Sequence, residues 1–169
     1  MDGYTIRLAT VNDAASIARH RVEMFRDMGQ VPTDALASEL LRGSTIAIRQ
    51  ALNGHSYIGW LAVDDEGKVI AGAGVHVKRQ LPRVHLDEVR HGPVPLVVNV
   101  YTEPEWRGKG IARALMQTLL QWAREQGFDR VVLHASDAAR SLYESLGFKA
   151  TNEMRWTPPA TSDSDPDQR

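Results

Sequence analysis

The sequence predicts an α/β (α+β) fold, because apolar segments with strand and helix patterns alternate along the chain. Residues 57–63 and 69–77 are two apolar runs joined by an Asp-Asp-Glu-Gly turn, which predicts an antiparallel hairpin. Residues 111–123 instead carry their apolar side chains at helical spacing. Between them, an apolar run at 94–101 is typical of a buried strand and leads into a turn that contains two glycines.

The remaining elements follow from capping residues, apolar periods and turn residues. We expect, in order, a strand at 4–8, a helix capped by Asn12 or Asp13 that ends near Gly29, a second helical segment that opens at Pro32 and Thr33 and breaks at Gly43, and one or two helical turns at 46–52. After the hairpin we expect a long loop at 79–95, the strand at 94–101, a helix at 111–126, a short strand at 130–134, a helix at 137–146 and a last strand at 152–156.

We expect residues 1–156 to form a single domain. Residues 157–169 are rich in Pro, Ser and Asp, which predicts a disordered C-terminal tail.

Composition excludes several classes of function. The net charge of −1 and the lack of a Lys/Arg run give little support for nucleic-acid binding. The absence of cysteine excludes disulfides, a cysteine nucleophile and thiolate-bound metal, and no histidine spacing predicts another metal site. No apolar signal segment or membrane-length stretch is evident, so we expect a cytoplasmic protein without membrane contact.

The most informative stretch runs from Val98 to Ala112. An apolar strand is followed by a Pro-containing turn, by Gly108 and Gly110 on either side of Lys109, and by an amphipathic helix. Glycines allow the backbone to approach a ligand closely, and a helix start presents unpaired N–H groups and the positive end of its dipole. The stretch therefore predicts a cradle for phosphate oxygens.

This stretch resembles the acetyl-CoA-binding motif of the GCN5-related N-acetyltransferases, the GNAT superfamily. The family signature is Arg or Gln, two residues, Gly, one residue, then Gly or Ala, and Arg107, Gly110 and Ala112 occupy those positions. Residues 139–148, with a Tyr-Glu pair and a Gly-Phe pair, resemble a second family element. The resemblance implies the GNAT fold, a mixed and mostly antiparallel sheet flanked by helices, with a splayed central strand pair.

The resemblance also implies acetyl-CoA as co-substrate and no metal. Backbone N–H groups of the glycine loop would hold the pyrophosphate, while the pantetheine would lie beside the splayed strand like an added strand. A backbone N–H of that strand would polarise the acetyl carbonyl. The cofactor-binding residues expected on this basis are Val100, Tyr101, Thr102, Arg107, Gly108, Lys109, Gly110, Ile111, Ala112 and Ser136, the last of which stands where the family commonly has asparagine.

Tyr143 is the expected catalytic residue. The family uses the tyrosine at this motif position as a general acid, which protonates the departing thiolate of coenzyme A. The alternative for Tyr143 is a helix tyrosine packed against Phe148.

The general base is not assigned by the sequence. Many relatives have a glutamate on the strand before the cradle, but residues 94–100 contain no acid and Asn99 is their only polar side chain. The remaining candidates are His134, His76 and Glu23. Glu103 and Glu105 flank a proline in a turn, so we expect them to be solvated.

These observations predict an N-acetyltransferase that passes the acetyl group directly to an amine of a small molecule, protein or peptide. A competing interpretation is a GNAT-like module that binds or senses acyl-CoA without transferring the group; another keeps transfer but changes the acyl group or the acceptor atom. A homodimer is compatible with edge pairing through Trp60, Trp156 and the terminal strand.

Overall fold

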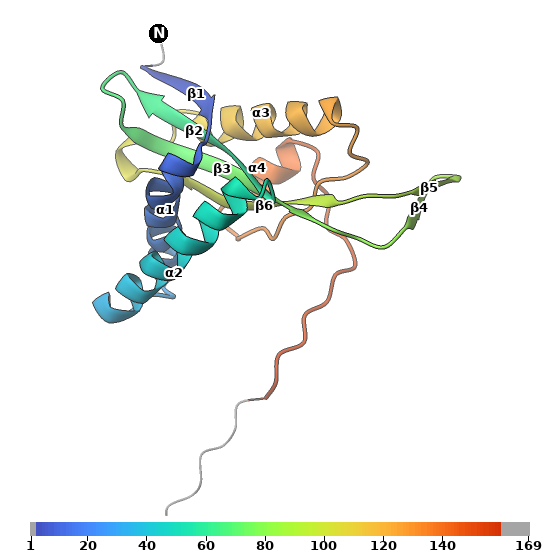
Figure 1. Ribbon diagram of the computed structural model, residues 1–169, viewed down its shortest axis with the longest axis horizontal. Coiled ribbons are helices and arrows are strands. Elements are labelled where there is room, and N and C mark those ends of the chain that lie inside the picture. Colours follow the sequence, from blue (N-terminus) through green and yellow to red (C-terminus); the bar gives the residue numbers. More distant parts are fainter. Residues whose placement is uncertain (1–2, 160–169) are drawn as a thin grey trace, which may run out of the picture.

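The computed structural model describes residues 3–159, and Figure 1 shows a sheet with helices on both faces. The elements are β1 (Tyr4–Leu8), η1 (Val11–Asp13), α1 (Ala14–Asp27), α2 (Asp34–Asn53), β2 (Tyr57–Asp64), β3 (Val69–Lys78), β4 (Arg83–His85), β5 (Glu88–Arg90), β6 (Val94–Thr102), η2 (Pro104–Trp106), α3 (Ile111–Glu125) and α4 (Arg140–Ser145). Residues 157–159 of the predicted tail have no regular structure, and the rest of that tail lies outside the described residues.

The sheet has the strand order β1-β2-β3-β6, and each of these neighbours pairs antiparallel. Beyond β6, Val132 adds one parallel bridge opposite Leu96. The predicted hairpin is confirmed as β2 and β3, and the prediction of a mixed, mostly antiparallel sheet is also confirmed.

Each face of the sheet is covered by its own apolar cluster. One face carries α3, whose Ile111, Leu115 and Leu119 pack with the inner side chains of β2, β3 and β6. The other face carries α1 and α2, whose Ile17 and Ile48 pack against β2. Figure 1 shows α3 above the sheet and the α1–α2 pair below it. Because both faces of the sheet are buried, the sequences of these strands are nearly continuous apolar runs.

β6 is paired along one edge and almost unpaired along the other. The Val97 N–H donates to the Val132 carbonyl at 2.8 Å, and the Val132 N–H donates to the Pro95 carbonyl at 3.0 Å. Within residues 3–159, no further bridge joins β6 to the segment around Val132, so these two parts of the chain separate after Val97. The C-terminal half of β6 thus has an open edge, as the splayed strand pair requires.

The helical predictions hold for α1 but need correction in α2. α2 continues through Gly43, because a single glycine costs a helix only about 1 kcal/mol and the buried Ser44, Ile48 and Leu52 that follow hold this helix on the sheet. The N-terminal caps also differ. Thr10 caps the turn before α1, and Asp13 instead accepts two hydrogen bonds from the Arg7 guanidinium, at 2.8 and 2.9 Å.

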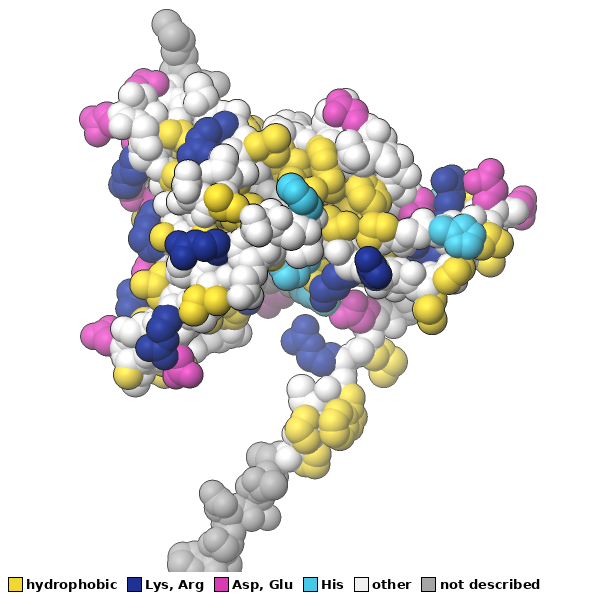
Figure 2. Space-filling model, in the orientation of Figure 1, with side chains coloured by type: hydrophobic (Ala, Val, Ile, Leu, Met, Phe, Trp, Pro, Cys, Tyr) yellow, Lys and Arg dark blue, Asp and Glu magenta, His cyan; other side chains and the backbone are white. Residues whose placement is uncertain are grey.

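The loop expected at 79–95 contains the strands β4 and β5, which form a separate two-stranded ribbon. The ribbon projects from the body in Figure 1, and hydrophobic side chains gather on it in Figure 2. Leu86, at its turn, is 81% exposed. The segments between the prolines are short and show no clear apolar period, so the sequence does not predict that β4 and β5 pair.

Three C-terminal predictions also change. The strand expected at 130–134 reduces to the single bridge at Val132, and the helix expected at 137–146 reduces to α4. The strand expected at 152–156 is absent, and Trp156 is 80% exposed. A strand needs a paired neighbour as well as an alternating pattern, and this segment has none within residues 3–159.

Trp60, expected at a dimer edge, is instead buried against Trp122, with their rings 5.4 Å apart.

Candidate functional site

The predicted cradle lies at the start of α3. Gly108 and Gly110 have φ angles of +75° and +78°, a region that glycine enters without steric cost. A Cβ added at either glycine meets no atom within 4 Å, so the loop borders open space. The Ala114 N–H donates to the Gly110 carbonyl at 3.0 Å, so the N–H groups of the three preceding helical residues have no partner within the helix. Unpaired donors at a helix start can hold an anion.

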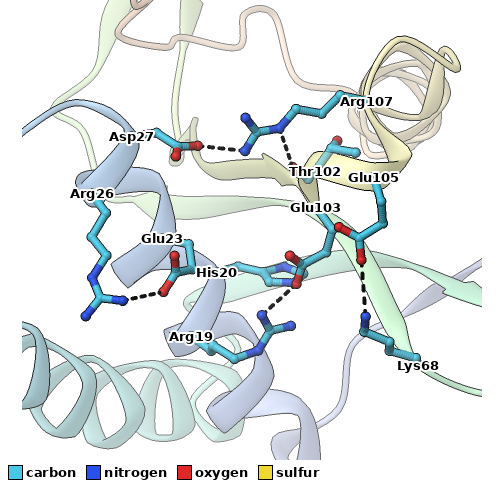
Figure 3. A network of polar contacts seen from close by, with 10 residues as sticks. All are labelled: Arg19, His20, Glu23, Arg26, Asp27, Lys68, Thr102, Glu103, Glu105 and Arg107. Carbon is cyan, nitrogen blue, oxygen red and sulfur yellow. Dashed lines mark hydrogen bonds and ion pairs between the residues drawn. The ribbon is translucent and has the colours of Figure 1, made fainter.

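Arg107 does not stand free beside this loop. Its Nε donates to the Thr102 carbonyl at 2.9 Å, and its Nη2 donates to Asp27 at 2.7 Å, as Figure 3 shows. The guanidinium also lies 5.5 Å from the ring centre of Tyr101. Arg107 therefore ties the end of β6 to the end of α1. Its predicted contact with coenzyme A stays a prediction, as does that of Lys109.

Glu103 corrects a prediction, because it is buried rather than solvated. Its N–H donates to the Ile70 carbonyl at 2.9 Å, which continues the pairing with β3 and directs the side chain towards α1. Arg19 lies 2.6 Å from Glu103 Oε1, and His20 Nε2 lies 3.3 Å from the same oxygen. Figure 3 shows this group between α1 and the end of β6.

His20 is neutral in this setting. Burial, reinforced by the positive charge of Arg19, lowers the pKa of His20 to about 4, and Glu103 only partly opposes the effect. The imidazole also lies 4.9 Å from the Tyr101 ring, measured between centres. The group is a packed connection between α1 and β6, and sequence reasoning missed it because its members are far apart in the chain.

The open edge of β6 begins at a bulge centred on Asn99. Asn99 is buried and has a φ of +57°, a conformation that asparagine tolerates better than most residues. Its Oδ1 accepts a hydrogen bond from Arg21 Nη1 at 2.7 Å. The Tyr57 hydroxyl lies over Gly74, which pairs with Val98 of β6, so a Cβ added at Gly74 would overlap it. Burial raises the pKa of Tyr57 to about 12, so this phenol stays protonated.

A cavity of about 650 Å³ lies between the α1–α2 pair and strands β3 and β6. Its polar lining comes from Arg21, Glu39, Ser44, His76, Lys78 and Asn99. The rest is mostly apolar, which is usual for a small-molecule site. Burial, with help from the two nearby cations, lowers the pKa of His76, so its imidazole is neutral near pH 7.

Tyr143 lies on α4 and is 7% exposed, with its ring 5.9 Å from that of Phe148. Burial raises its pKa, so the phenol retains its proton at neutral pH. Ser136 is exposed, and its carbonyl accepts from the Ala139 N–H at 3.1 Å in the turn before α4.

The three candidate general bases differ in their position relative to the cavity. His76 lines the cavity, whereas Glu23 accepts from Arg26 at 3.1 Å and does not line it. His134 is exposed, with its Nδ1 3.4 Å from Glu153. Within residues 3–159, no cluster of three or more His, Cys, Asp or Glu side chains is placed to hold a metal ion, and no helix is long and apolar enough to cross a bilayer.

Comparison with known proteins assigns this architecture. A family model described as the acetyltransferase (GNAT) family matches residues 19–148, which run from within α1 through β2, β3, β6 and the glycine loop to the end of α4 and leave out β1. The chain belongs to this GNAT family.

Solved GNAT structures match nearly the whole chain. A GCN5-related N-acetyltransferase from Ralstonia eutropha JMP134 is 29% identical, with a TM-score of 0.80, over 92% of this chain and 99% of that one. A protein from Clostridium acetobutylicum, described as a predicted acetyltransferase with acetyl-CoA, is 26% identical, with a TM-score of 0.77, over 92% and 96% of the two chains.

Several curated relatives are longer proteins than this chain. The probable N-acetyltransferase family 8 member 5 of Mus musculus is 32% identical over 136 residues, which cover 74% of this chain and 52% of the relative. Across four mammalian members of the N-acetyltransferase 8 group, the matched part is 23% to 52% of the relative's length.

The neutral state of His20 predicts a pH-dependent stability of this GNAT domain. The pKa is 6.5 when unperturbed and about 4 in the fold, so protonation favours the unfolded chain, and stability falls as pH decreases from 6.5 towards 4. Between about pH 7 and about pH 5 the loss from this one group is about 2 kcal/mol. Urea unfolding at both pH values measures it.

His20→Gln should remove this part of the pH dependence, and His91→Gln, at an exposed histidine, is the matched control. An unchanged pH slope in His20→Gln would show that the folded protein binds the proton at His20 without penalty.

Proposed function

We propose that this chain is an acetyl-CoA-dependent N-acetyltransferase that passes the acetyl group directly to an amine. The observation that supports the proposal most strongly is that three features follow one another along β6. An acceptor-sized cavity meets the strand at Asn99, an open strand edge follows, and the glycine loop comes next. Acceptor, thioester and pyrophosphate would be held in that order. The family assignment and the acetyl-CoA of the Clostridium neighbour support this choice of donor.

The donor would be held mainly by backbone groups. The pantetheine amides would bond the open edge of β6 at Val100, Tyr101 and Thr102, and the pyrophosphate would bind backbone N–H groups from Gly108 to Ala112. A backbone N–H at the bulge would polarise the acetyl carbonyl. The exposed Lys109 would add positive charge, whereas Arg107 would act by holding the end of β6 in place.

The transfer needs one proton acceptor and one proton donor. The amine nitrogen attacks the acetyl carbonyl carbon, and the C–S bond breaks as the tetrahedral intermediate collapses. We assign the amine proton to His76, which is neutral and lines the cavity. We assign protonation of the leaving thiolate to Tyr143, whose raised pKa keeps its proton in place. No covalent enzyme intermediate is needed.

The coenzyme site is tested by Gly110→Glu, which places bulk and negative charge in the loop. Acetyl-CoA affinity should fall roughly 100-fold or more, because a carboxylate would face the pyrophosphate. Isothermal titration of the folded variant measures the loss.

Gly127→Glu is a closely matched control, since Gly127 follows the other end of α3 with a φ of +74° and no atom within 4 Å of an added Cβ. Equal affinities in the two variants would remove the loop from the binding site. Absence of acetyl-CoA binding by the wild type would overturn the proposed function.

Tyr143→Phe tests the general acid. Turnover should fall by about 100-fold, the usual scale for a positioned acid, while the dissociation constant for acetyl-CoA changes little. Steady-state kinetics and titration separate the two. Tyr4→Phe, at a partly buried tyrosine outside the site, is the control. Unchanged turnover would return Tyr143 to a packing role, and binding without any transfer would favour the sensing module.

His76→Gln tests the base through a ratio of rates. At neutral pH the variant should be slower by about 100-fold in kcat/KM. Below the lowered pKa of His76 the wild type loses its base, so the ratio of wild type to variant should shrink towards one. Taking the ratio cancels ionisation of the acceptor amine. A constant ratio across the pH range would exclude His76 as the base.

A further inference from the structure

Arg21 is a cation in the cavity lining, and no carboxylate within residues 3–159 pairs with it. Its guanidinium donates to the neutral amide oxygen of Asn99 at 2.7 Å and lies 4.8 Å from the ring centre of Phe25. The residue is half-buried, and burial lowers its pKa. A guanidinium has five N–H donors, and the bond to Asn99 uses one of them. The remaining donors are available to a ligand in the cavity that Arg21 lines.

The neighbouring arginines differ in this respect. Arg19 pairs with Glu103, Arg26 pairs with Glu23, and Arg107 pairs with Asp27, as Figure 3 shows. Arg21 is the one arginine of α1 that has no ion pair within residues 3–159. A partly buried cation is costly when unpaired, so an anionic ligand would relieve that cost.

The rest of the cavity fits the same kind of ligand. Lys78 adds a second positive charge at its edge, and the neutral His76 adds none. Glu39, on the exposed face of α2, is the one carboxylate among its lining residues. The apolar wall, which includes Leu40 and Val98, would accept a hydrocarbon group.

We propose that the acceptor is a small apolar amine that also carries an oxyanion, either a carboxylate or a phosphonate-type group, and that Arg21 binds this oxyanion. The inference rests on the proposed function and adds the acceptor class to it. Because Arg21 is bonded to Asn99, next to the strand edge where the thioester would lie, the oxyanion and the amine would be close together in the acceptor. α-Amino acids with apolar side chains have this arrangement.

The experiment compares three acceptors that differ only in one group: phenylalanine, its neutral amide and its aminophosphonate analogue. Acetyl transfer from acetyl-CoA is measured for each as kcat/KM, with wild type, Arg21→Met and Arg21→Lys. Arg42→Met, at an exposed arginine of α2 outside the cavity, is the control for loss of charge. Titration with acetyl-CoA alone is run on every variant.

The wild type should prefer an oxyanion-bearing acceptor over the amide by roughly 30-fold or more, the scale of a charge pair in a partly buried site. Arg21→Met should abolish that preference while acetyl-CoA affinity is retained, Arg21→Lys should recover part of it, and Arg42→Met should keep it. Whichever of phenylalanine and its aminophosphonate analogue has the higher kcat/KM identifies the preferred oxyanion.

The amide reacting as well as the acids, or Arg21→Met slowing all three acceptors equally, would overturn the inference and leave acetyl transfer intact. Acetyl-CoA binding without transfer to any of the three would also overturn it. Failure of the wild type to bind acetyl-CoA would instead overturn the proposed function on which the inference rests.

Discussion

The incomplete pairing of β6 is the constraint on which the rest of the site depends. One edge of this strand is bonded to β3 almost throughout, and among residues 3–159 the other edge is bonded only around Val132. Backbone donors and acceptors at an open edge must find another partner, which can be water or a ligand that lies like a strand. The open edge starts after Val97, and the bulge at Asn99 lies close to that point. The glycine loop then follows at the end of the same strand, so the chain order fixes the order of the predicted binding contacts.

An open strand edge needs support, and α1 provides it through two kinds of contact. Arg107 and Asp27 pair at the surface, where a single ion pair contributes at most about 1 kcal/mol. Glu103 and His20 are buried and Arg19 is exposed, so loss of either partner would leave the buried Glu103 carboxylate with one contact fewer. The buried group therefore has the larger effect on how α1 sits on the strand, and the surface pair fixes the turn into the loop.

Local patterns predicted the parts of this protein whose causes are local. The hairpin, α1, β6 and α3 follow from apolar periods and turn residues, and the glycine loop lies at the start of α3 as its position in the sequence predicted. The cavity and the contact of Glu103 with His20 arise from residues far apart in the chain, and no local pattern encodes them. Gly43 and the 152–156 segment show the opposite failure: a breaker was overridden by packing, and an alternating pattern found no strand to pair with.

The position of α1 links support of the strand to the choice of acceptor. Successive residues of a helix point about 100° apart, so Arg19, His20 and Arg21 reach different parts of β6 from one turn. The first two meet Glu103 at the end of the strand, and Arg21 meets Asn99 at its bulge. The contacts at Glu103 thus help to hold the same helix turn from which Arg21 reaches the cavity. An oxyanion paired with Arg21 would be placed relative to the same strand that aligns the thioester, so a single helix would position the acceptor against the donor.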